Sequence, residues 1–70
     1  MKYELFYPTG GHGGPYHSLN EAVVAARRLL RGFITGTITY IDIRLRTKDG
    51  FGDVVQRVTL DEANAEGSEA

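Results

Sequence analysis

The sequence predicts an α+β fold with the element order β-α-β-β. Three observations lead to this fold: one amphipathic helical segment, a strand-like alternation before it, and a β-hairpin pattern after it. We expect a three-stranded, mainly antiparallel sheet with the single helix packed on one face. We favour the strand order 1-3-2, because it makes every neighbouring pair antiparallel, and the order 1-2-3 is the alternative.

Residues 18–32 carry the helical pattern. Ser18 is a suitable N-cap, and Glu21 can reach back to the N–H of Ser18 to complete a capping box. Gly32 can end the helix in a left-handed conformation. The apolar residues recur at helical spacing on one face, which predicts that this face packs on the sheet: Leu19, Ala22, Val23, Ala26, Leu29 and Leu30.

The segment before the helix divides into a strand and a loop. Residues 2–7 alternate, so we expect Tyr3, Leu5 and Tyr7 to face the helix and Phe6 to point to the opposite side. Residues 8–17 contain four glycines and two prolines, which is typical of a flexible connector. We expect His12 and His17 to be solvated there. Two histidines without cysteines do not make a metal site, since zinc generally takes three or four protein ligands.

Residues 35–60 predict a β-hairpin that turns at Asp49-Gly50. In that register the numbers of opposed residues add up to 99. Two opposite-charge pairs then form on one face, Arg46 with Asp53 and Asp42 with Arg57. The other face becomes almost continuously apolar, with the pairs Leu45–Val54, Ile43–Gln56, Ile41–Val58 and Thr39–Leu60.

Composition sets the limits of the domain. We expect residues 1–60 to form a single βαββ domain and residues 61–70 to be a disordered acidic tail. Residues 1–60 hold all eight Lys and Arg but five acids, a net charge of +3, whereas residues 61–70 carry four acids and no base, a charge of −4. The chain lacks cysteine, a membrane-length apolar run and a signal-peptide pattern, so we expect a cytoplasmic protein without membrane association.

One sheet face remains uncovered by the single helix. We expect it to carry Lys2, Glu4, Phe6, Ile38, Tyr40, Arg44, Arg46, Val55 and Arg57. Aromatic and arginine side chains are enriched in protein interfaces. We therefore predict that this face binds a partner, through Phe6, Tyr40, Arg44, Arg46 and Arg57, with Arg27, Arg28 and Arg31 of the helix as a second set.

Residues 18–60 resemble several small phage-encoded and mobile-element proteins, including some anti-CRISPR proteins. The resemblance is carried by Ser18-Leu19-Asn20-Glu21-Ala22, Gly36-Thr37-Ile38-Thr39 and Lys48-Asp49-Gly50. It implies a non-enzymatic inhibitor that binds a host protein complex and blocks nucleic-acid access or recruitment. No individual site residue is carried over from those proteins.

Three function classes differ in how well these residues fit them. The sequence favours a stoichiometric protein-binding module without catalysis, cofactor or metal, and a homodimer is one form that this binding can take. The alternative is a small nucleic-acid-binding domain that stacks bases on the aromatic and arginine side chains of the sheet. We do not expect an enzyme, because no nucleophile–base pair or facing pair of carboxylates is evident.

Overall fold

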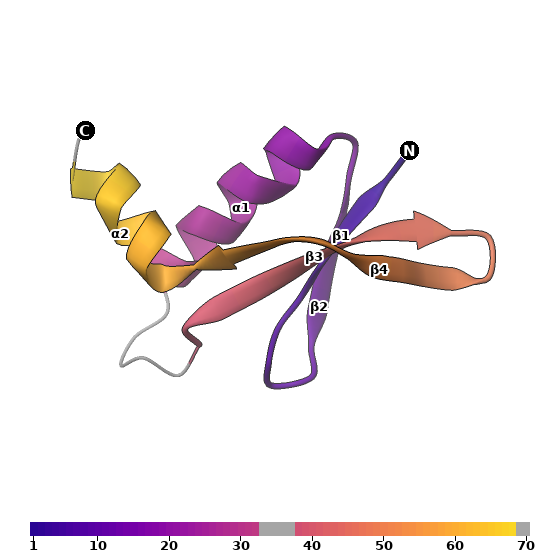
Figure 1. Cartoon of the computed structure of the whole chain (residues 1–70), viewed down its shortest axis with the longest axis horizontal. Coiled ribbons are helices and arrows are strands. Elements are labelled where there is room, and N and C mark those ends of the chain that lie inside the picture. The colour runs from indigo at the N-terminus through magenta and orange to yellow at the C-terminus, as the bar shows by residue number, and fades with distance from the viewer. Residues whose placement is uncertain (33–37, 69–70) are drawn as a thin grey trace.

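The computed structural model describes residues 1–32 and 38–68, which form one antiparallel sheet and two helices (Figure 1). The four strands lie in the order β2-β1-β3-β4. The α+β class and the antiparallel pairing are confirmed, but the prediction of three strands and one helix is wrong. The elements are β1 (Tyr3–Phe6), β2 (His12–Tyr16), α1 (Leu19–Gly32), β3 (Tyr40–Thr47), β4 (Gly50–Thr59) and α2 (Leu60–Ser68).

The favoured strand order is also wrong. β1 pairs with β3, placing Tyr3 opposite Leu45 and Leu5 opposite Ile43, and β4 lies at the edge. The three predicted strands therefore follow the alternative order 1-2-3. The physical reason is burial: β3 contributes the fully buried Ile41 and Ile43, whereas half of the β4 residues are exposed and Val58 is its one buried residue. The central position buries both sides of a strand's backbone, and the more apolar strand occupies it.

The extra strand, β2, lies within the glycine-rich segment that was predicted to be a connector. Tyr7 N–H donates to Gly11 O at 2.9 Å, and Gly10, at φ +105°, donates to Tyr7 O at 3.0 Å. At Gly13 a Cβ would lie 2.8 Å from the Tyr7 hydroxyl. The glycines therefore permit a tight hairpin that a side chain at Gly13 would obstruct.

Helix α1 begins as predicted, with one small difference. Ser18 Oγ accepts from Glu21 N–H at 3.1 Å, and the Glu21 carboxylate accepts from His17 N–H rather than from Ser18 N–H, also at 3.1 Å. Gly32 is the last helical residue and lacks the predicted positive φ. The predicted strand start at residues 35–37 and the resemblance residues Gly36-Thr37 lie outside the described residues.

The core lies between α1 and the sheet. On the helix side it consists of Ala22, Val23, Ala26 and Leu30. These residues belong to the face that the helical spacing had indicated. They pack against buried residues of the sheet and against Ile38, which lies just before β3; the sheet residues are Leu5, Ile41, Ile43 and Val58.

The β3–β4 register matches the prediction in one half of the hairpin only. Ile41 lies opposite Val58 and Asp42 opposite Arg57, as predicted. Two irregularities then shift the strands, so that Arg44 faces Val54 and Arg46 faces Phe51.

The turn residues are Lys48 and Asp49, with Gly50 already in β4 at φ +137°. The predicted turn at Asp49-Gly50 and the predicted pairs Arg46–Asp53 and Leu45–Val54 are therefore wrong. The β-bulges redirect the side chains of β4, and Phe51 reaches the ring of Phe6.

Helix α2 occupies residues 60–68, where a disordered tail was predicted. Ala63 is fully buried against the core, and its carbonyl accepts from an Arg31 guanidinium nitrogen of α1 at 3.2 Å. Thr59 Oγ1 accepts from Glu62 N–H at 3.3 Å at the start of the helix. The composition suggested too little apolar surface to order this segment, but one buried alanine and contacts to α1 position it. Across the described ranges neither helix has the length and apolar character required to cross a bilayer.

Candidate functional site

The site is the sheet face opposite α1, which we call the open face. Because Leu5, Ile41 and Ile43 point into the core, the residues alternating with them in β1 and β3 point away from it. β2 adds His12, and β4 adds Phe51 and Arg57, which contact the rings of Phe6 and Tyr40. The open face is defined by Glu4, Phe6, His12, Tyr40, Asp42, Arg44, Arg46, Phe51 and Arg57.

Three rings from three different strands form an aromatic cluster on the open face. Phe6 stacks on His12 at a centroid distance of 5.6 Å and meets Phe51 edge-on at 4.7 Å. The guanidinium of Arg44 lies 5.2 Å from the Phe6 centroid, and that of Arg46 lies 5.9 Å from the Phe51 centroid. Cation–π contacts of this kind contribute about 0.5–1 kcal/mol at exposed sites and favour arginine conformations that lie over the ring.

Beneath this cluster lies a buried carboxylate. Glu4 is 5% exposed, although the sequence placed it on an uncovered face. His12 Nδ1 donates to Glu4 Oε2, and Arg46 Nε lies 3.9 Å from Glu4 Oε1. The prediction that His12 lies in a loop is wrong, because it belongs to β2, but its side chain is exposed as predicted, at 56%, while it contacts Glu4.

A second group lies at the other end of β3. Arg57 donates two hydrogen bonds to Asp42, at 2.7 and 3.1 Å, and its guanidinium lies 4.1 Å from the centroid of Tyr40. These hydrogen bonds raise the pKa of Arg57 above its ordinary value. Beside this group is a hollow of about 350 Å³, lined by Thr39, Tyr40, Arg57, Thr59, Leu60 and Asp61.

The structure brings five predicted site residues together on the open face: Phe6, Tyr40, Arg44, Arg46 and Arg57. Ile38, which was expected there, is instead part of the core at 4% exposure. The sequence analysis missed His12, which was assigned to a loop, and Phe51, which was not among the residues predicted for this face. The pairing of β1 with β2, and of β3 with both β1 and β4, brings these two rings to Phe6, and no local sequence motif indicates these contacts.

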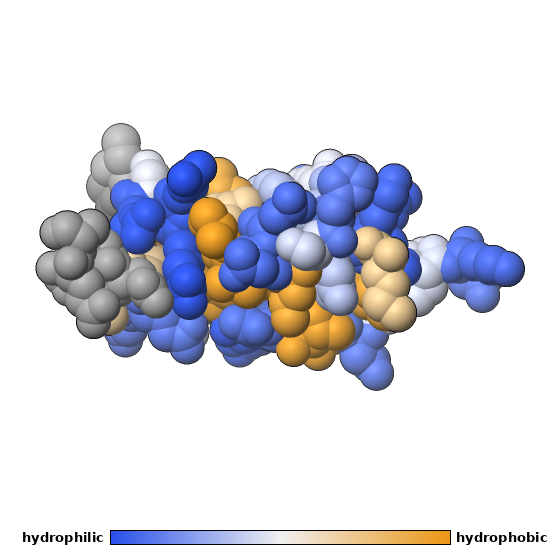
Figure 2. All heavy atoms as spheres, turned by 90° about the horizontal axis from the view of Figure 1, so that it is seen from above, coloured by the Kyte–Doolittle hydropathy of each residue, from blue (hydrophilic) through white to orange (hydrophobic). Residues whose placement is uncertain are grey.

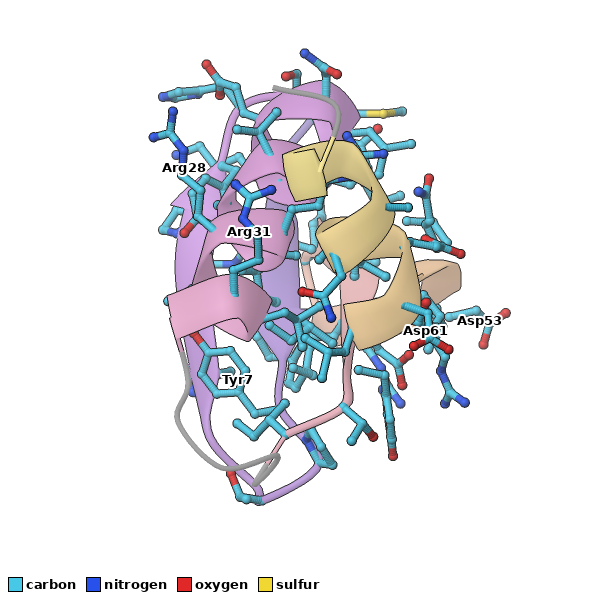
Figure 3. The ribbon with its side chains drawn as sticks, turned by 90° about the vertical axis from the view of Figure 1, so that its left-hand side faces the viewer. Tyr7, Arg28, Arg31, Asp53 and Asp61 are labelled. Atoms are coloured by element: carbon cyan, nitrogen blue, oxygen red, sulfur yellow. The ribbon has the colours of Figure 1, made fainter. Side chains whose placement is uncertain are left out.

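The helix arginines do not join this site. Figure 3 shows Arg28 and Arg31 on α1, well away from Asp53 and Asp61 at the β4 side. Arg31 contacts α2, and Arg27 is half-buried. The predicted second set of contact residues therefore lies on the opposite side of the sheet from the first.

A shallow groove lies on the helix side, between β2 and α1. Its volume is about 650 Å³, and it includes exposed Val24 together with Arg28. Seen from the helix side, the surface is largely hydrophilic with hydrophobic atoms emerging between the polar ones (Figure 2). The groove is lined by Pro15, Tyr16, His17, Asn20, Glu21, Val24, Ala25, Arg28 and Leu29.

Metal binding finds no support in the described part of the chain, where no three His, Cys, Asp or Glu side chains gather closely enough to hold an ion. The side chains that define the open face are aromatic rings, guanidinium groups and carboxylates. Comparison of the chain with protein-family models, with curated proteins and with solved structures gives no match.

Proposed function

We propose that this protein is a stoichiometric binding protein that contacts another protein through the open face of its sheet. The observation that carries this proposal is the aromatic cluster of Phe6, His12 and Phe51, with Arg44 and Arg46 stacked against its rings. Phenylalanine and arginine are enriched at interfaces between proteins, where large rings supply contact area at a low cost in side-chain entropy.

The exposure of β4 supports the same surface. Phe51 and Val54, which lie opposite Arg46 and Arg44 of β3, are 40% and 41% exposed. They are two of the five large hydrophobic residues that are exposed in the described ranges. Such a local concentration of apolar side chains beside oriented arginines is typical of an interaction surface rather than of scattered exposure.

The resemblance to small anti-CRISPR proteins suggests one class of partner to test first. On this proposal the chain inhibits a host defence complex by occupying the surface through which that complex contacts nucleic acid or a recruited protein. The mildly basic charge of residues 1–60 suits an acidic partner surface.

Photo-crosslinking tests the proposed surface. Benzoylphenylalanine is introduced in place of Phe51 in one variant and in place of Val24, an exposed apolar residue of α1, in the control. We expect a protein adduct in the source cell from position 51 that disappears when Tyr40→Ala and Arg44→Ala are added. Circular dichroism checks that the fold persists. An adduct from position 24 alone would move the contact to the helix-side groove and refute the open face.

Nucleic-acid binding is the second candidate, and the stacked rings and arginines of the open face are the feature that favours it. Against it, Asp42 engages Arg57, and Asp53, Asp61 and Glu62 are exposed near the β4 side. Titration with single- and double-stranded oligonucleotides at low salt separates the classes. We expect no binding at micromolar protein, whereas tight, steeply salt-dependent binding would favour nucleic acid.

A further inference from the structure

The three arginines of the open face differ in how their charge is neutralised. Arg57 makes two hydrogen bonds to Asp42, and Arg46 lies 3.9 Å from the Glu4 carboxylate. The Arg44 side chain forms no ion pair or hydrogen bond with a described residue, and its Nε is buried without an acceptor. Its guanidinium lies over the ring of Phe6.

The strand register explains why the Arg44 side chain lacks an acidic partner. Glu4 lies directly opposite Arg44 in the β1–β3 pair, where a cross-strand ion pair would ordinarily form. The Glu4 carboxylate instead accepts from His12 of β2 and is buried beneath that ring. The Glu4 carboxylate therefore binds His12 of β2 instead of Arg44, and the Arg44 guanidinium lies over Phe6 without a counter-charge.

On the other side of β3, the residue opposite Arg44 is Val54. Val54 and Phe51, both in β4, are about two-fifths exposed, so an apolar wall flanks the unpaired guanidinium. A guanidinium held on an aromatic ring loses little further conformational freedom when it binds a carboxylate. The resulting charge-assisted hydrogen bonds are stronger than those between neutral groups.

From this arrangement we infer that Arg44 is the receptor for a carboxylate supplied by the partner protein. The inference rests on the proposed function and names the chemistry of the partner: an Asp or Glu side chain next to an aliphatic or aromatic residue that packs on Phe51 and Val54. Charge complementarity at Arg44 selects an acidic segment over a basic one, and the apolar wall selects a peptide over a free anion.

Selection from a phage-displayed library of random 12-residue peptides tests the inference on the full chain. We expect enriched peptides to share an acidic residue beside a large apolar one. Chemically synthesised representatives should bind the Arg44→Gln variant at least about tenfold more weakly, measured by fluorescence anisotropy. Arg44→Lys should restore only part of the affinity, because lysine lacks the bidentate fork. Lys48→Gln, which removes the same charge from the exposed turn between β3 and β4, should leave binding unchanged.

The outcomes separate this inference from the proposed function. One outcome is that the enriched peptides lack an acidic residue and bind Arg44→Gln as tightly as the parent chain, but do not bind Phe51→Ala. This would overturn the proposal that Arg44 receives a carboxylate, while the open face would remain the binding surface. Peptides that are insensitive to both variants would overturn both proposals. The inference would also be overturned if the parent chain enriched no peptide beyond those that the Arg44→Gln variant enriches. Binding of a single-stranded oligonucleotide through Arg44 would overturn it as well. Circular dichroism of each variant confirms that a loss reflects the surface and not unfolding.

Discussion

His12 of β2 donates a hydrogen bond through Nδ1 to the buried carboxylate of Glu4 in β1. These residues belong to adjacent antiparallel strands, and β1–β2 pairing places His12 beside Phe6 and close to Glu4. The contact joins the glycine-rich hairpin to the sheet and covers a carboxylate that water would otherwise solvate. It also leaves Arg44 without a counter-charge, so one side-chain pair shapes both the stability and the electrostatics of the open face.

The first prediction concerns this pair. His12→Ala should lower the free energy of unfolding by about 1–2 kcal/mol, because it removes a hydrogen bond to a buried carboxylate. The matched control is His17→Ala, whose exposed side chain should contribute less than about 0.5 kcal/mol. Urea unfolding followed by circular dichroism measures both. Combining His12→Ala with Glu4→Gln completes a double-mutant cycle, and additive effects would contradict a direct interaction.

The shifted β3–β4 register can be tested by disulfide formation, since the chain has no cysteine of its own. Arg46→Cys combined with Phe51→Cys should oxidise readily, because these residues are directly opposed. Arg46→Cys combined with Asp53→Cys represents the unshifted register and should oxidise slowly. Gel mobility or mass spectrometry after mild oxidation distinguishes the two, and faster closure of the second pair would restore the simple hairpin.

Docking of α2 depends on Ala63, which is fully buried. Ala63→Asp should detach α2 from α1 and lower the free energy of unfolding by about 1–3 kcal/mol, because it buries an unpaired charge or forces the helix away. Ala65→Asp adds the same charge at an exposed position of the same helix and is the control. Hydrogen exchange of residues 60–68 reports the detachment. Equal protection in both variants would show that Ala63 does not anchor the helix.

Tyr7 should make stability fall in alkaline solution. Burial, and secondarily the proximity of Tyr16, raise the pKa of Tyr7 above its ordinary value of 10.0. As the pH rises through 10, Tyr7 ionises first in the unfolded state, so the folded state loses its advantage until its own raised pKa is passed. Tyr7→Phe should therefore show a shallower decline between pH 9 and the alkaline unfolding limit. Urea unfolding at several pH values checks this, and equal slopes would contradict it.

Much of the local structure was predictable from residue pattern alone. The capped helix at Ser18 and Glu21, the alternation around Leu5, and the pairing of Asp42 with Arg57 were predicted and are present. Each depends on neighbours in sequence or on one hairpin, so short-range periodicity and capping chemistry suffice to indicate it.

Long-range packing produced everything that the pattern missed. Strand β2 forms because glycines at positions such as Gly13 let Tyr7 approach, and α2 is ordered by the burial of a single alanine against α1. Neither segment contains enough local signal to overcome its glycine or acidic composition. The sequence therefore establishes the α+β class, the helix and most of the rings and cations of the open face. His12 contacts Glu4, and Phe51 contacts Phe6, only because the four strands pair in this order. Pairing between segments that are distant in the sequence produces no periodic pattern of residues from which it could be predicted.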